Sequence, residues 1–243
     1  MIKLNCDMGE SFGIWELGED ELIMPFIDMA NLACGFHASD SMIMSHSVNL
    51  AVKYNISIGA HPSYQDLVGF GRRSISCTDE EITALILYQL GALDAFCKAK
   101  NTQVTYLKPH GALYNDMMKN ENIFTAILEA ISAFNPNIKL MILSTPNFER
   151  FENIAFSYNV KLIYEVFADR NYNDDGSLVS RTQKNAVVSN ENEVIQRVKI
   201  LEQENYINSI NGKKLFIKAD TICVHGDGQN ALSFIKALRK VLK

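Results

Sequence analysis

Four of the five histidines in this 243-residue chain follow short apolar segments and have acidic or basic neighbours. Imidazole, carboxylate and ammonium groups together can transfer protons, stabilise charge or bind a metal ion. A single histidine in such a place is more often structural, but four with nearby acids favour one shared site. The segments that carry these histidines are Ala33–Asp40, Gly59–Pro62, Lys108–Gly111 and Val224–Asp227. A fifth segment, Asn5–Gly13, also follows an apolar run and supplies two acidic residues. His46 lies within an expected helix and is interpreted as structural.

Two long loops carry further polar groups. Gly69–Arg73 places two arginines beside glycines, and a guanidinium matches a carboxylate or a phosphate. A solvated basic turn explains the same residues equally well. The connection Ala168–Ser189 is expected to be poor in helix, which is typical of a lid or binding loop. Its candidate contact residues are Arg170, Tyr172 and Arg181.

The cysteines indicate packing rather than cross-linking. There are five of them, an odd number without a Cys-x-x-Cys pair, so no disulfide framework is expected. Cys6, Cys34 and Cys223 are interpreted as small buried apolar residues. A reactive thiolate needs an activating base, and only Cys34 with His37 offers such a pair. This usage predicts a reducing, cytoplasmic location.

Seven short apolar segments alternate with helical ones along most of the chain, which predicts a parallel α/β fold. The expected strands are Ile2–Cys6, Met29–Cys34, Ile56–Ala60, Val104–Leu107, Leu140–Leu143, Lys161–Phe167 and Thr221–Val224. The clearest helices are Asp40–Tyr54, Asp79–Lys100, a segment beginning near Asn190, and Gln229–Leu242. A single seven-stranded β/α-barrel domain over residues 1–243 is favoured over an open doubly wound sheet, because polar residues follow strand after strand.

Composition excludes several classes of function. A net charge of −5 and a pI near 5.6 argue against a nucleic-acid-binding protein. No uninterrupted apolar run approaches the roughly 18 residues of a membrane span. The sequence has no P-loop, no Gly-x-Gly-x-x-Gly, no His-Glu-x-x-His and no Gly-x-Ser-x-Gly. A nucleotide, if used, is therefore not held by those devices.

Taken in order, six blocks of this sequence resemble the LamB/YcsF family of lactam-utilisation proteins across nearly the whole chain. They are Asn5–Gly13, Asn31–Asp40, Gly59–Arg73, Lys108–Asn115, Glu165–Arg181 and Cys223–Asp227. Ser39 and Gln65 depart from the family pattern at flanking positions.

The resemblance implies a barrel similar to that of NodB-type deacetylases and glycoside hydrolases. It also implies ATP-dependent opening of 5-oxo-L-proline to L-glutamate, with this chain as the A subunit of a 5-oxoprolinase that has partner subunits B and C. Neither nucleic acid nor membrane is an expected partner, and self-association is left open.

The residues suit such a reaction, which needs an activated carbonyl, a nucleophilic water and a protonated leaving nitrogen. Asp7 or Glu10 is the hypothesised base, helped by His61 or His110, and one histidine would protonate the nitrogen. Lys108 would stabilise charge on the lactam oxygen or its phosphate. The candidate substrate-binding residues are Asn5, His37, Asp40, Arg72, Arg73, Tyr114, Asp169, Arg170, His225 and Asp227.

A divalent metal is a further expectation that spacing leaves open, because the ligands come from separate strands. Its candidate ligands are Asp7, His37, His61, His110 and His225. Two other functions also remain open. One is a metal-dependent amidase or deacetylase that works alone on another amide or a carbohydrate, and the other is a non-catalytic lactam-binding subunit.

Overall fold

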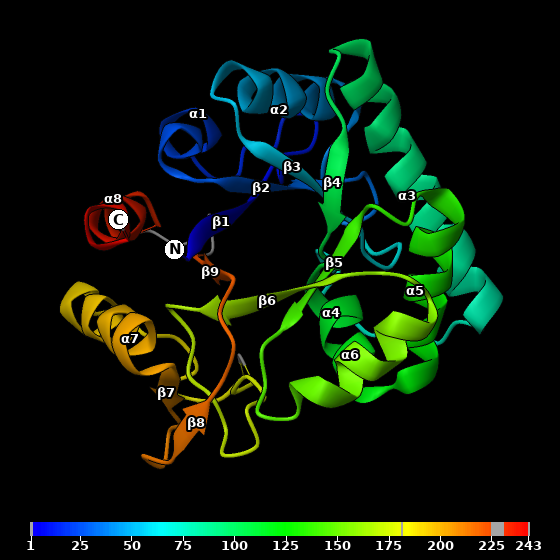
Figure 1. The fold of residues 1–243 in the computed structure, drawn as a ribbon. Helices are drawn as coiled ribbons and strands as arrows, with labels where there is room; N and C mark the ends of the chain where they lie inside the picture. Colours follow the sequence, from blue (N-terminus) through cyan, green and yellow to red (C-terminus); the bar gives the residue numbers. More distant parts are fainter. Residues whose placement is uncertain (1, 181, 225–230, 243) are drawn as a thin grey trace.

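The structure is a computed structural model that describes residues 2–180, 182–224 and 231–242. Seven parallel strands close into a barrel in the order β1-β2-β3-β4-β5-β6-β9, and helices surround it (Figure 1). The barrel strands are β1 (Lys3–Met8), β2 (Met29–Ala33), β3 (Ser57–His61), β4 (Val104–Leu107), β5 (Lys139–Leu143), β6 (Leu162–Phe167) and β9 (Thr221–Cys223). The predicted barrel is confirmed, and each expected strand lies within two residues of the observed one.

The helices occupy the connections between strands. They are α1 (Asp20–Ile23) with the 3₁₀ turn η1 (Met24–Phe26), α2 (Ser41–Lys53), α3 (Asp79–Ala99), α4 (Gly111–Lys119), α5 (Glu121–Phe134), α6 (Phe148–Ser157), α7 (Glu191–Glu204) and α8 (Ala231–Val241). α3 begins where the sequence predicts, because Thr78 and Glu81 form a reciprocal capping box.

A small antiparallel hairpin, β7 (Tyr206–Asn208) and β8 (Lys214–Phe216), is an addition to the predicted fold. Its turn contains Asn211-Gly212, with Gly212 at a φ of +81°. An Asn-Gly pair between two short apolar segments is a hairpin signal, and three-residue strands are too short for the apolar pattern alone to reveal.

Among the described residues, only α3 is long and apolar enough to cross a membrane by length and composition. The expectation from apolar runs overlooked this helix because polar residues interrupt it. Its buried residues include Gln89, whose side chain hydrogen-bonds the Ser63 backbone beside β3. α3 also packs along α5, as a helix in the outer shell of a barrel does (Figure 1).

Alternate residues of the strands face the inside of the barrel, as the two-residue period of a strand requires. Nearer the amino ends of the strands, the interior holds an apolar cluster of Met29, Tyr106, Met141 and Ile163. Two residues further along the same strands the side chains become polar, and Asn31, Lys108 and Glu165 follow Met29, Tyr106 and Ile163. The polar layer therefore lies toward the carboxyl ends of the strands, where parallel barrels carry their active sites.

Candidate active site

The ends of β3 and β4 fix three of the candidate residues on rigid backbone. Lys108 N donates to Ala60 O at 2.9 Å, and His110 N donates to Pro62 O at 2.7 Å, so pairing continues beyond the regular strands. His61 and Lys108 each precede a proline, which favours extended backbone. Their side chains therefore point into the barrel mouth from a fixed frame.

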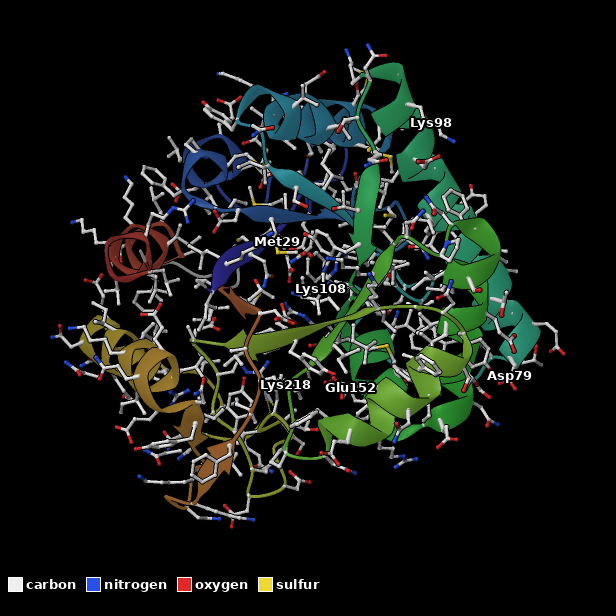
Figure 2. The ribbon with its side chains drawn as sticks, in the orientation of Figure 1. Met29, Asp79, Lys98, Lys108, Glu152 and Lys218 are labelled. Atoms are coloured by element: carbon white, nitrogen blue, oxygen red, sulfur yellow. The ribbon has the colours of Figure 1, made fainter. Side chains whose placement is uncertain are left out.

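A buried charge cluster occupies the centre of the barrel (Figure 2). Lys108 Nζ lies 2.8 Å from Asp7 Oδ1 and 2.8 Å from Glu165 Oε1, and also donates to Cys223 Sγ at 3.3 Å. Burial disfavours the charged lysine, but the neighbouring carboxylates outweigh it and raise the pKa of Lys108 well above its usual range. The lysine is thus a fixed cation.

Amides and tyrosines hold this cluster in place. Asn31 Nδ2 donates to Asp7 Oδ1 at 2.7 Å and to Asn5 Oδ1 at 2.8 Å. Tyr106 in turn donates its hydroxyl to Asn31 Oδ1 at 2.7 Å, and Asn5 Nδ2 donates to Thr221 Oγ1. Tyr114 from α4 donates to Glu165 Oε2 at 2.8 Å.

Three histidines pack together beside the charge cluster. The rings of His37 and His110 stack with centroids 3.8 Å apart and planes within 4°, and His61 meets both edge-on. Glu10 Oε1 lies 3.2 Å from His37 Nε2 and 3.4 Å from His110 Nδ1. His61 Nε2 lies 3.5 Å from Asp7 Oδ1, which joins the histidines to the lysine cluster.

Backbone carbonyls fix the tautomers of two of these histidines. His61 Nδ1 donates to Lys108 O at 2.7 Å, and His110 Nε2 donates to Phe70 O at 2.9 Å. Burial, together with the neighbouring histidines, holds the pKa of His37 and of His110 well below the ordinary value. The environment thus favours neutral rings.

The loop after β3 covers the histidines. The Phe70 ring meets His37 and His110 edge-on, and Gly71 lies so close that an added Cβ would be 2.8 Å from His110 Cδ2. With a φ of +63°, Gly71 occupies a backbone region that suits glycine. The sequence suggested an anion clamp here, and the structure adds a positioning role for Phe70 and Gly71.

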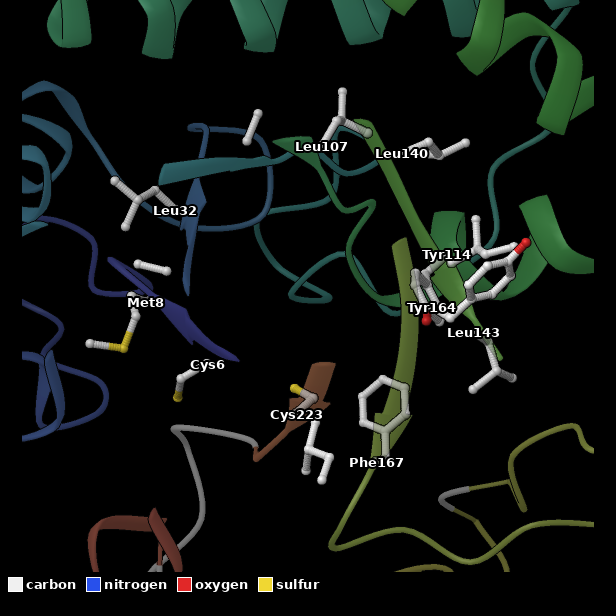
Figure 3. Packing of buried hydrophobic residues seen from close by; sticks show 14 of the residues in the cluster. Cys6, Met8, Leu32, Leu107, Tyr114, Leu140, Leu143, Tyr164, Phe167 and Cys223 are labelled. Carbon is white, nitrogen blue, oxygen red and sulfur yellow. The ribbon is translucent and has the colours of Figure 1, made fainter. Parts of the chain in front are cut away.

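A cavity of about 470 Å³ opens above the charge cluster. It is lined by the catalytic candidates Asp7, Glu10, His61, Lys108 and His110, by Arg72, Tyr114, Lys119, Phe167 and Arg170, and by part of the connection after β6, including Ser180 and Thr182. Phe167, which lines this cavity, is paired with Cys223 between β6 and β9 (Figure 3). All five residues predicted as catalytic therefore share one cavity.

Other predicted binding residues have structural partners. The Asp40 carboxylate accepts from Met42 N and Ile43 N and so caps α2. Arg73 binds Asp66 within the loop after β3 and does not line the cavity. Asn5 and His37 are buried behind the cavity wall.

The residues after β6 and β9 complete the placement of the candidates. Arg170 is buried at the cavity edge, where its guanidinium donates to Val179 O and Ala186 O and ties the connection together. Asp169 is buried beside it, and its backbone O accepts from Val188 N. Tyr172 is buried and its hydroxyl accepts from Phe167 N. His225 and Asp227, like Arg181, lie outside the described residues.

The remaining interpretations concern His46 and the cysteines. His46 lies on the surface of α2, 3.4 Å from Glu21. Cys6, Cys34 and Cys223 are free and buried, and burial raises the pKa of Cys34 to about 12. Cys34 Sγ donates to Leu32 O, so the described contacts do not pair it with His37. These residues match the structural interpretation.

Glu165 and Asn31 belong to the site although neither was named among the sequence candidates. Both lie within strands that are otherwise mostly apolar, and both are fully buried. A lone carboxylate in a buried strand requires a partner, which is the signal that could have identified Glu165. Asn31 carries a weaker form of the same signal.

Glu10, His37, His61 and His110 form the one group of potential metal ligands found among the described residues, with ligand atoms all within 4.8 Å of one another. Three of the predicted ligands are in this group. Glu10 takes the place predicted for Asp7, whose Oδ1 instead contacts Lys108 and Asn31.

Comparison with known proteins gives a consistent result over the whole length. The LamB/YcsF family model matches residues 2–243. Two proteins named as the A subunit of 5-oxoprolinase, from Vibrio cholerae and Bacillus thuringiensis subsp. konkukian, are 51% and 47% identical to the chain over 241 and 242 residues. These alignments cover 99% and 100% of this chain and 97% and 95% of the relatives.

A solved structure shares the fold. The lactam utilization protein from Thermus thermophilus superposes with a TM-score of 0.91 at 35% sequence identity, covering 99% of this chain and 95% of that one. Family model, relatives and fold agree, and the chain belongs to the LamB/YcsF family.

Proposed function

We propose that this protein is the A subunit of a 5-oxoprolinase, which opens 5-oxo-L-proline to L-glutamate with ATP as co-substrate. The observation that carries the proposal is a fixed lysine cation next to a carboxylate, Lys108 and Asp7, in the wall of one cavity. Relatives near 50% identity that bear the name of this 5-oxoprolinase component support the choice of substrate.

An unstrained lactam needs activation before water can open it. In the proposed reaction the lactam oxygen attacks the γ-phosphorus of ATP, the bond to the leaving ADP oxygen breaks, and an O-phosphorylated lactam forms. Water then adds to the ring carbon, the carbon–nitrogen bond breaks, and a second water releases phosphate from the resulting acyl phosphate. The sum is one ATP, one 5-oxoproline and two waters giving glutamate, ADP and phosphate.

Lys108 and Asp7 have complementary parts in this reaction. Lys108 stabilises negative charge on the lactam oxygen and on its phosphate, and a preorganised donor of this kind typically contributes about 10²–10³-fold. Asp7 takes a proton from the attacking water and returns it to the leaving nitrogen. Because Asn31 and Lys108 fix Asp7 Oδ1, the carboxylate is aimed before substrate binds.

Anion recognition falls to cations at the cavity rim. Arg72 and Lys119 line the cavity, and both suit a substrate carboxylate or a phosphate. Arg170 is already engaged with backbone carbonyls, so its proposed role is to shape this rim. Since the sequence lacks a P-loop, we assign ATP delivery to the partner subunits B and C.

The test is glutamate formation from 5-oxoproline by the purified chain, with and without the two partner subunits and with ATP present or omitted. Asp7→Asn in the complex should cut turnover by at least about 10²-fold while circular dichroism stays native. The matched control is Asp174→Asn, an exposed carboxylate outside the cavity lining whose partners are Ser209 and Asn211.

Each outcome has a meaning. Glutamate made by this chain alone without ATP would refute the proposal. ATP-independent, chelator-sensitive cleavage of another amide or an N-acetylated sugar would establish the amidase or deacetylase alternative. An Asp7→Asn variant that weakens lactam binding without a separate loss of turnover would indicate a binding subunit.

A further inference from the structure

The nitrogens of His61 and His110 that face each other both lack a proton in the neutral rings. The far nitrogens, His61 Nδ1 and His110 Nε2, donate their hydrogens to backbone carbonyls. His61 Nε2 and His110 Nδ1 are therefore lone-pair atoms, yet they lie only 3.0 Å apart. Two lone pairs repel at this distance, so a positive charge must be shared between them.

We propose that His61, His110 and Glu10 bind a divalent cation of the zinc type at this point of the cavity wall. The proposal concerns a ligand set and does not depend on the reaction proposed above.

The spacing of the donor atoms is close to that of ligands of one ion. Two ligands at about 2.0–2.2 Å from a tetrahedral zinc lie about 3.3–3.6 Å from each other. The His110 Nδ1–Glu10 Oε1 distance of 3.4 Å lies in this range, and the His61 Nε2–His110 Nδ1 distance of 3.0 Å is slightly shorter. Neutral imidazole with carboxylate is also the donor combination that zinc and similar ions accept.

The outer contacts have the pattern of a metal site. Metal-binding histidines almost always donate their other N–H to a carbonyl, carboxylate or water, which fixes the tautomer and aims the lone pair. His61 and His110 both do so. His37 contacts Glu10 at 3.2 Å, and its ring lies parallel to His110 rather than edge-on. A histidine binds a metal ion in the plane of its ring, and an ion in the plane of the His110 ring lies outside the plane of the parallel His37 ring. We therefore assign His37 the role of positioning the Glu10 carboxylate instead of binding the ion.

Because Glu10, His61 and His110 all line the cavity, such an ion would face bound substrate. An ion with three protein ligands keeps a position for water or substrate, and it can polarise a carbonyl or lower the pKa of bound water.

The experiment measures metal rather than activity. Protein made without a metal-affinity tag is analysed for metal by mass spectrometry, depleted with a chelator, and titrated with Zn²⁺ by calorimetry and with Co²⁺ by visible absorption. Wild type should bind one equivalent, and so should His46→Ala, the matched control with its exposed histidine on α2. Glu10→Gln and His110→Ala should each weaken Zn²⁺ binding by at least about 10²-fold, and His37→Phe by about 10–100-fold.

The double variant His61→Ala/His110→Ala decides the matter. Loss of Zn²⁺ uptake and of the Co²⁺ spectrum, in a chain that melts cooperatively, would support the site. Depleted wild type that takes up neither ion, or that binds no better than the double variant, would overturn it and leave a shared proton between the rings. Since the titration contains no lactam, this failure would leave the proposed reaction standing.

Discussion

Replacing Lys108 by methionine tests whether the central charge cluster is a balanced unit. Methionine keeps an unbranched apolar stem but leaves Asp7 and Glu165 without their shared cation. At an effective dielectric near 20, unit charges 4 Å apart attract by about 4 kcal/mol, and these two pairs are closer, at 2.8 Å. The desolvation that the ions already bear offsets much of this attraction, and removing one partner of a buried pair costs about 3–5 kcal/mol.

We therefore expect Lys108→Met to lower the free energy of unfolding by about 3–5 kcal/mol at pH 8. For a chain of this size the melting temperature should fall by about 6–20 °C. The matched control is Lys218→Met, which breaks an exposed 2.7 Å pair with Glu152 and should cost no more than about 1 kcal/mol (Figure 2). Urea unfolding followed by far-ultraviolet circular dichroism measures both variants.

The pH dependence of that loss has a definite sign. In the wild type, burial disfavours the charged lysine, but the neighbouring carboxylates raise the pKa of Lys108 well above its usual range. A group whose pKa is raised on folding contributes stability that is fully present below its unfolded pKa and is lost as the pH rises through the folded pKa. The deficit of Lys108→Met relative to wild type should thus be present in full at pH 8 and should shrink only above the unfolded pKa of lysine, about 10.4.

A second substitution separates charge from packing. Glu165→Gln added to Lys108→Met removes one uncompensated charge and keeps an acceptor for Tyr114, so part of the stability should return. The reasoning fails if Lys108→Met costs no more than Lys218→Met at pH 8, or if Glu165→Gln brings no recovery.

Three further changes probe neighbouring features. Gly71→Ala should strain the backbone and push His110, lowering turnover of the reconstituted enzyme far more than Gly212→Ala, a turn glycine with open space around it. Thr78→Ala should cost about 1 kcal/mol in urea unfolding, since it removes the cap of α3, and an unchanged stability would contradict the capping role. Burial raises the pKa of Cys34 to about 12, so mass spectrometry after iodoacetamide at pH 8 should find the half-buried Cys77 alkylated before Cys34, and the reverse order would contradict the assignment.

The barrel could be predicted because its strands have a recognisable apolar pattern in the sequence. A parallel strand buried on both sides requires a continuous apolar run, and Val104–Leu107 is found where such a run predicts it. Pro62 and Pro109 gave further information, because the residue before a proline keeps an extended backbone. The side chain of that residue is therefore held at the end of the strand. His61 and Lys108 could be placed at the barrel mouth for this reason.

The partners of these residues were less predictable, because pairing across a closed barrel depends on register. Arg73 resembles an anion ligand in sequence, yet seven residues earlier Asp66 offers a nearer carboxylate. Asp40 has the chemistry of a substrate contact but also that of a helix cap, and only the chain direction after it decides between them. A sequence motif thus identifies which functional groups are present, but the partners of these groups depend on the folded structure.

Glu165 shows how the two sources of information combine. Within Leu162–Phe167 it interrupts an apolar strand, and its burial is tolerable because a cation crosses the barrel to meet one carboxylate oxygen while Tyr114 donates to the other. That cation is Lys108, the residue that follows β4, and it also contacts Asp7 of β1 and Cys223 of β9. Closure of the barrel is what brings these four positions to one point, so an open sheet with the same sequence pattern would leave Glu165 without this cation. A buried acid in a strand of a parallel fold is thus itself evidence for closure, and it identifies the strand on which the central charge must be sought.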